Sequence, residues 1–347
     1  MTVATLRSVA ALKAAELVSD ALAPQLAAVE AAYAIALPEP LARAIDRNNP
    51  GDAIRRQYVP SPEELDIRAG ESGDPIGDAR HSPVPGLVHR YPDRVLIKAT
   101  STCPVYCRFC FRREMVGPEK GEALTKTDLD AVFAYISAHP EIFEVILTGG
   151  DPLMLSAARA REITQRLESI AHVKLIRWHT RMPVTRPDLI TPAYAEALSS
   201  RKKAVFLAVH ANHASEFTAE AVAACRLLAE QGIALVSQSV LLRGVNDTVE
   251  DLSDLMRAFL SAGIKPYYLH QLDAAPGTAH FRVPVAEGQR LVRALRDNLS
   301  GLAVPHYVLD IPGGVSKASL ALPDIERRDD TWSVRGRDGE IYPLADD

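Results

Sequence analysis

Short runs of apolar and aromatic residues recur along the middle of the chain. They occupy residues 94–100, 143–149, 173–180, 203–210, 233–240 and 265–272. Each run has the length of one β-strand, and segments with apolar residues at helical spacing separate the runs. Strands that alternate with helices predict a parallel sheet, because parallel neighbours need a crossover connection of a dozen or more residues.

The helical segments carry start and stop signals. Thr125 can cap a helix whose apolar face contains Leu129, Val132, Phe133 and Ile136. Two later helical segments both end in glycine, as helices often do. Six strand–helix units are too few for a closed eight-stranded barrel. We therefore predict the α/β class and a partial (β/α)6 parallel barrel, with an open doubly wound sheet as the alternative.

The two ends of the chain differ from this middle part. Residues 1–90 predict an N-terminal extension that is helical and irregular, with many turn-forming residues. The core is predicted over residues 91–317 and a tail over residues 318–347. Within the tail, residues 331–344 predict a hairpin with Asp338 and Gly339 at its turn.

Composition narrows the class of protein. The chain has 347 residues, of which 47% are hydrophobic, and a net charge of −5. This is not the basic surface of a nucleic-acid-binding domain. No apolar run approaches the ~20 residues of a membrane span, and no signal peptide is visible. We expect a cytoplasmic protein with no nucleic-acid or membrane partner, in which thiols stay reduced.

Three of the four cysteines lie close together. Cys103, Cys107 and Cys110 form a C-x3-C-x2-C pattern just after the first predicted strand, whereas Cys225 lies within a helical segment and is predicted to be a buried core thiol. In folds of this class, loops at the carboxyl ends of strands carry the chemistry. The three clustered thiols are therefore candidates for metal ligands.

Two kinds of metal centre fit three thiols. Structural zinc needs four ligands, so a fourth would have to come from His89, Tyr91, His210 or His213. In a [4Fe-4S] cluster, three thiolates leave one iron open to a further ligand. An open iron is a place where a bound molecule can react.

The cysteine spacing and its position resemble the radical S-adenosylmethionine superfamily. The sequence TGGD at residues 148–151, at the end of the second predicted strand, is similar to the superfamily's glycine-rich motif for the amino group of S-adenosylmethionine. The resemblance implies that Gly149 and Gly150 let this cofactor approach the backbone closely. It also implies that Asp151 helps to hold the cofactor's ammonium.

From about residue 40 onwards the chain resembles the lysine 2,3-aminomutase family. The matching segments are residues 82–96, 107–113, 148–151, 237–247, 266–273, 279–285 and 308–317. The resemblance implies an isomerase that interconverts L-lysine and β-lysine by 1,2-amino migration. It implies three cofactors: a [4Fe-4S] cluster held by the three clustered cysteines, S-adenosyl-L-methionine and pyridoxal 5′-phosphate.

The resemblance also assigns residues to pyridoxal phosphate. Lys317 matches the lysine that forms a Schiff base with this cofactor, although the glycine-rich run before it is shorter here than in the family. Arg90, Arg94 and Gln238 match positions in the region of the cofactor's phosphate. Arginine suits phosphate because its donors form a fork.

Substrate binding is implied in the same way. Arg112 matches the family's carboxylate-binding arginine, and Asp273 and Asp310 match two aspartates that hold the distal ammonium of lysine. Burying an ammonium without partners costs several kcal/mol, so a lysine site needs carboxylates. The same residues leave arginine or ornithine open as substrates.

The family has two branches that this chain partly matches. Shorter members make β-lysine for modification of elongation factor P, and longer catabolic members carry a cysteine-rich zinc tail. This chain ends before such a tail, and Thr248 replaces another zinc cysteine, so we expect no zinc. Three alternatives remain open. The protein could form β-lysine for the modification of elongation factor P, or it could be a non-catalytic partner in that modification. It could also be an aminomutase for another amino acid.

Partners follow from the same resemblance. We expect a small-molecule amino acid as substrate and an external reductant such as flavodoxin or ferredoxin. Assembly into a homo-oligomer is compatible with the resemblance.

Overall fold

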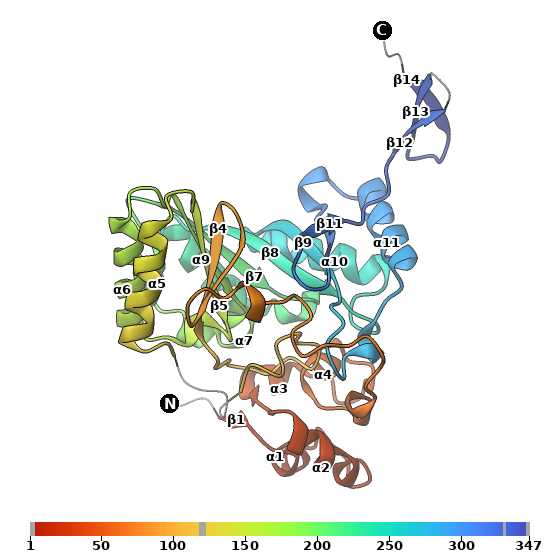
Figure 1. Cartoon of the computed structure of the whole chain (residues 1–347). Helices are drawn as coiled ribbons and strands as arrows, with labels where there is room; N and C mark the ends of the chain where they lie inside the picture. The colour runs from red at the N-terminus through yellow and green to blue at the C-terminus, as the bar shows by residue number, and fades with distance from the viewer. Residues whose placement is uncertain (1–3, 118–122, 329–330, 345–347) are drawn as a thin grey trace.

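The computed structural model describes residues 4–117, 123–328 and 331–344, and its main element is a curved sheet (Figure 1). Within these residues the order of strands across the sheet is β11-β10-β9-β8-β7-β6-β5-β4-β3. In chain order the strands are β3 (Leu87–Tyr91), β4 (Arg94–Thr100), β5 (Glu144–Gly149), β6 (Leu175–Thr180), β7 (Ala204–His210), β8 (Ala234–Leu241), β9 (Lys265–Gln271), β10 (His306–Asp310) and β11 (Lys317–Ser319).

All six runs predicted as strands are strands, from β4 to β9. They are parallel neighbours in chain order, and β10 adds a further parallel strand next to β9. The edge strands β3 and β11 are antiparallel to β4 and β10. Since the order never reverses, right-handed crossovers place the helices on one face. This confirms the partial barrel over the doubly wound sheet, whose order reverses at a switch point.

Helices follow most of the parallel strands. They are α5 (Lys126–Ala138), α6 (Ala157–Ser169), α7 (Met182–Thr185), α8 (Pro192–Leu198), α9 (Ala219–Glu230), α10 (Val249–Ser261) and α11 (Val285–Asn298), with the 3-10 turns η3 (Pro152–Met154), η4 (Pro187–Leu189), η5 (Ala214–Glu216), η6 (Ala279–Phe281) and η7 (Gly301–Ala303). Thr125 caps α5 as predicted, in a reciprocal capping box with Asp128. Cys225 in α9 is fully buried, as predicted.

The two faces of the sheet differ in chemistry. In β6, Ile176 and Trp178 are buried in the core formed with the helices. Because successive side chains of a strand point to opposite faces, Arg177 and His179 point to the concave inner face. Burial alternates in the same way along β4 and β8, so polar side chains can gather on the inner face while apolar burial holds the helices to the outer face.

The N-terminal extension packs beneath the carboxyl ends of the strands (Figure 1). Its elements are β1 (Thr5–Leu6), α1 (Val9–Ala14), α2 (Ala23–Ala32), β2 (Leu37–Pro38), α3 (Glu39–Ala44), α4 (Ala53–Tyr58), η1 (Pro62–Leu65) and η2 (Ala79–His81). It has an apolar cluster of its own, which Val105 of the cysteine-bearing loop joins. The extension thus supports the loop on which the cysteines lie.

The C-terminal tail forms a small separate sheet that projects from the body (Figure 1). Its strands are β12 (Ile325–Arg328), β13 (Thr331–Arg335) and β14 (Ile341–Leu344). The predicted hairpin is present between β13 and β14, and Gly339 at its turn has φ 86°. In the described ranges, no helix has the length and apolar character needed to cross a membrane.

Candidate active site

An open cavity of about 910 Å³ lies at the carboxyl ends of the parallel strands. Its walls contain nine of the predicted site residues, which are Cys103, Cys107, Cys110, Arg112, Gly149, Gly150, Asp151, Gln238 and Asp273. The structure therefore brings the cysteines, the TGGD segment and part of the predicted substrate site together.

The three thiols share this cavity but do not converge on one point. In the described part of the chain, no three His, Cys, Asp or Glu side chains are close enough to hold a single metal ion. A four-iron cluster takes one thiolate per iron, so its ligands surround a larger volume. Burial raises the pKa of the Cys107 thiol to about 12, so this thiol carries a proton until a metal replaces it.

The TGGD segment is attached to the backbone of the cysteine loop. The amide of Gly150 donates to the carbonyl of Thr100 (2.6 Å) and the amide of Asp151 to that of Thr102 (2.9 Å). A Cβ on Gly149 or Gly150 would overlap these same carbonyls. The glycines thus let the cysteine loop lie directly against the end of β5. This explains why glycine is needed here by a backbone contact, whereas the sequence analysis explained it by the close approach of a ligand.

Asp151 connects the TGGD segment to β6. Its buried carboxylate accepts hydrogen bonds from Leu153 N (3.0 Å), Thr180 Oγ1 (2.7 Å) and Arg181 N (2.8 Å). Burial raises its pKa, and the hydrogen bonds from Thr180 and Arg181 oppose this. Because hydrogen bonds from the protein reach both of its oxygens, the side chain holds the loop in shape. Its contact with a cofactor ammonium stays a prediction.

Two arginines of the cysteine loop pair with one carboxylate from the N-terminal extension. Arg108 Nη2 lies 2.5 Å from Glu64 Oε2, and Arg113 also forms an ion pair with Glu64. Glu64 is fully buried. Burial alone would raise its pKa, but the charges of the two arginines lower it. The carboxylate thus stays ionised and fixes the loop to the extension.

A second buried carboxylate joins two predicted ligand-binding arginines. Arg112 Nε donates to Asp78 Oδ2 (3.0 Å), and Arg90 Nη2 lies 3.4 Å from Asp78 Oδ1. Arg112 also donates to Thr148 Oγ1 (3.3 Å). Burial alone would raise the pKa of Asp78, whereas Arg112, Lys98 and Arg90 lower it. Asp78, which sequence reasoning missed, orients both guanidinium groups.

Lys317 lies at the opposite edge of the parallel strands, where β11 pairs with β10. It faces Asp310 in the strand register, and its Nζ is 2.5 Å from Asp310 Oδ1. His270 Nδ1 donates to the other carboxylate oxygen (3.1 Å). Burial lowers the pKa of Lys317, although Asp310 opposes this. Burial alone would raise the pKa of Asp310, but His270 and Lys317 lower it.

Asp273 is close to this pair and also faces the cavity. It lies just beyond the end of β9, and burial together with the charge of Asp310 raises its pKa to about 7. Lys317, Arg112 and Arg90 act on it in the opposite direction. Five predicted site residues from distant parts of the chain therefore interact electrostatically as one charged group, which consists of Arg90, Arg112, Asp273, Asp310 and Lys317.

Arg94 is a predicted site residue at the opposite end of its strand from the cysteine loop. It begins β4, whereas the cysteine loop follows the end of this strand. Its side chain pairs with Asp93 (2.9 Å) and stacks on Tyr91 (3.8 Å to the ring centre). Its charge acts on Tyr268, whose ring centre is 5.9 Å from Lys317 Nζ.

Sequence reasoning missed His179 as a functional residue and considered His210 only as a possible zinc ligand. His179 and His210 line the cavity, and their rings lie 5.4 Å apart. Burial lowers the pKa of both, to about 3 for His210, so both are neutral. Among the described residues, the buried Nε2 of each has no hydrogen-bond partner. Alternation along β6 and β7 is the signal that could have placed them on the inner face.

Comparison with protein-family models matches residues 97–258 to the Radical SAM superfamily. The matched range begins within β4 and includes the cysteine loop and the TGGD segment. Membership of this superfamily implies a [4Fe-4S] cluster and S-adenosylmethionine.

Comparison with known proteins narrows the family. The chain is 40% identical over 304 residues to L-lysine 2,3-aminomutase of Clostridium subterminale, 44% over 278 residues to that of Acetoanaerobium sticklandii, and 38% over 290 residues to that of Escherichia coli K12. These matches cover 87%, 80% and 84% of this chain, and 72%, 66% and 84% of the three relatives. The chain belongs to the lysine 2,3-aminomutase family, whose members are isomerases.

The contact between the TGGD segment and the cysteine loop can be tested with Gly150→Ala. The added Cβ would overlap the carbonyl of Thr102, which should cost ~1–3 kcal/mol and displace the loop. We expect the iron bound after anaerobic reconstitution to fall by at least about half at this cost. Gly301→Ala is the matched control, because nothing lies near a Cβ at that position. Full iron binding by Gly150→Ala would contradict the contact.

Proposed function

We propose that this protein interconverts L-lysine and β-lysine by moving the α-amino group to the β carbon, with a [4Fe-4S] cluster, S-adenosylmethionine and pyridoxal phosphate as cofactors. The observation that carries the proposal is that the cavity wall with the three thiols also contains Arg112 and Asp273, and that the charges of Arg90, Asp310 and Lys317 act on Asp273. When bound, the cluster and S-adenosylmethionine supply a radical that removes a β-hydrogen, and pyridoxal phosphate supplies the conjugated system for nitrogen migration.

The cysteine side of the cavity suits the first two cofactors. Three thiols on one loop supply three of the four irons of a cluster with ligands and leave the fourth open. The backbone at Gly149 and Gly150 lies on the same wall. The Nε2 atoms of His179 and His210, which have no hydrogen-bond partner within the described ranges, supply further polar contacts for a bound molecule. These features support S-adenosylmethionine binding between the cysteine loop and the inner face.

The lysine side of the inner face suits pyridoxal phosphate. A lysine must be neutral to attack the cofactor's aldehyde, and burial favours the neutral amine of Lys317. Arg90 has a buried Nε without a hydrogen-bond partner among the described residues, so it has a donor left for phosphate. Arg94 and Gln238 are further candidates for this phosphate.

The remaining charged groups suit a substrate with charges at both ends. Arg112 faces the cavity and can pair with the α-carboxylate of an amino acid. Asp273 and Asp310 can hold the distal ammonium once Lys317 is engaged by the cofactor. A cation between these two carboxylates would also relieve the repulsion that raises the pKa of Asp273. Lysine has an α-carboxylate and a distal ammonium, so it can pair with Arg112 and with both aspartates.

The proposed reaction also needs an electron from outside the chain. A reductant such as flavodoxin or ferredoxin would reduce the cluster. Substrate and product would enter and leave through the open side of the cavity. The proposed setting is the cytoplasm, where thiols stay reduced.

The cofactor lysine can be tested by borohydride trapping. Lys317→Ala should eliminate the covalent pyridoxal adduct, because the lysine is proposed to be its attachment point. Lys203→Ala is a suitable control, since burial also lowers the pKa of Lys203, which lies just before β7 and contacts Ile170 and Val173. It should retain the adduct. Peptide mapping that located the trapped group on another lysine would refute the assignment.

Substrate choice tests the role of the two aspartates. Norleucine lacks the distal amine, so it should leave Asp273 and Asp310 unpaired and react at least ~100-fold more slowly than lysine. Asp273→Asn or Asp310→Asn should lower kcat/KM for lysine by ~10-fold or more, with iron and pyridoxal content unchanged. The measurement is kcat/KM for both substrates with all three proteins.

Two observations would oppose this role. Equal turnover of lysine and norleucine by the wild type would exclude a site built for the distal ammonium. A loss of stability and cofactor content in Asp310→Asn, without a change in substrate preference, would indicate that Asp310 only supports Lys317.

The pKa of Asp273 gives an independent test of its role. The value of kcat/KM for lysine should rise between pH 6 and 8, because this carboxyl ionises near pH 7. Asp273→Asn should flatten the rise.

A further inference from the structure

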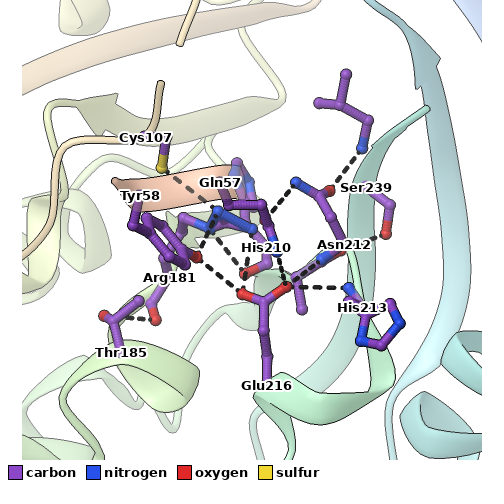
Figure 2. Close-up of polar contacts among 12 residues, drawn as sticks. Gln57, Tyr58, Cys107, Arg181, Thr185, His210, Asn212, His213, Glu216 and Ser239 are labelled. Atoms are coloured by element: carbon purple, nitrogen blue, oxygen red, sulfur yellow. Dashed lines mark hydrogen bonds and ion pairs between the residues drawn. The ribbon is translucent and has the colours of Figure 1, made fainter. Parts of the chain in front are cut away.

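A buried carboxylate, Glu216, lies where the N-terminal extension meets the loop after β7 (Figure 2). It accepts hydrogen bonds from Tyr58 Oη (2.9 Å) and Gln57 Nε2 (3.2 Å), both from α4. It also accepts from the backbone amides of Asn212 (2.7 Å) and His213 (3.0 Å). A carboxylate this deeply buried needs a counter-charge.

Arg181, the residue after β6, supplies that charge. Its Nη2 lies 3.5 Å from Glu216 Oε2, and its Nη1 donates to Tyr58 Oη (2.9 Å). Its Nε donates to the carbonyl of His210 (3.2 Å), and its own amide donates to Asp151. The backbone and the guanidinium of Arg181 are therefore fixed by different parts of the fold.

The guanidinium also reaches a thiol of the cysteine loop. Arg181 Nη1 donates to Cys107 Sγ at 3.3 Å, as Figure 2 shows. The other two thiols have backbone donors instead, from Asp151 to Cys103 and from Arg112 to Cys110. Cys107 thus differs from its neighbours, because its donor carries a full positive charge.

A cation at a ligand sulfur changes the energetics of a cluster. Reduction adds an electron, and a donor to a thiolate stabilises the more negative reduced form. We propose that Arg181 is a positioning residue that holds the Cys107 thiolate and raises the reduction potential of the [4Fe-4S] cluster. Glu216 and Tyr58 orient its guanidinium for this contact. The inference rests on the proposed ligation of the cluster by Cys103, Cys107 and Cys110.

The alternative is that Arg181 only neutralises Glu216. Two variants separate these roles. Arg181→Met combined with Glu216→Gln removes the cation without leaving a buried unpaired carboxylate, and Glu216→Gln alone keeps the cation. If Arg181 acts on the cluster, the double variant should have a more negative midpoint potential than the wild type, and Glu216→Gln should not.

The measurement is an anaerobic redox titration of the reconstituted cluster, followed by electron paramagnetic resonance, with bound iron determined alongside. A wild-type midpoint potential in the double variant at full iron content would overturn the proposal. If the double variant does not fold, Arg181→Lys decides, since one ammonium cannot serve both Glu216 and the sulfur. A potential more negative than that of the wild type supports the proposal, and an unchanged one overturns it.

The titration needs no aminomutase turnover, so it also separates this inference from the proposed function. Absence of lysine turnover would leave the measured potentials valid. A wild-type protein that cannot assemble a [4Fe-4S] cluster would overturn both.

Discussion

Three buried carboxylates, each paired with arginine, control the position of the cysteine loop. Glu64 pairs with two arginines of the loop, Asp78 pairs with a third and with Arg90, and Glu216 pairs with Arg181. The described residues of the loop contain no helix or strand, so regular backbone hydrogen bonds cannot fix it. Removing one partner of such a buried pair costs ~3–5 kcal/mol. These ion pairs therefore hold the loop where regular backbone hydrogen bonds are absent.

The curved sheet brings two chemical regions into one site. The cysteine loop follows β4, near one edge of the sheet, whereas Lys317 begins β11 at the other edge. Curvature turns both regions toward the same inner face, so the charges of Arg112 and Lys317 both act on Asp273. Apolar side chains on the outer face keep the helices in place, which leaves the inner face free for polar groups. One inner face can then hold the proposed cofactors and the proposed substrate together.

The six central strands and the grouping of three cysteines could be predicted from the sequence, because apolar runs and cysteine spacing are local signals. The short strand β10 was missing from the predicted repeat, since its five residues include polar ones at both ends. The buried carboxylates were not predictable, because Glu64 and Arg108 are 44 positions apart and Asp78 and Arg112 are 34 apart. Such pairs depend on the tertiary path of the chain. Likewise, only the structure shows that Gly150 faces another backbone.

The most direct test of this account is product analysis under anaerobic conditions. Reconstituted protein would be incubated with dithionite, S-adenosylmethionine, pyridoxal phosphate and either lysine, ornithine, arginine or glutamate, and the amino acids would be identified by mass and retention. We expect β-lysine from lysine, dependent on all of these additions, and little product from the other amino acids. Protein with full iron and pyridoxal content that forms no β-lysine would contradict it.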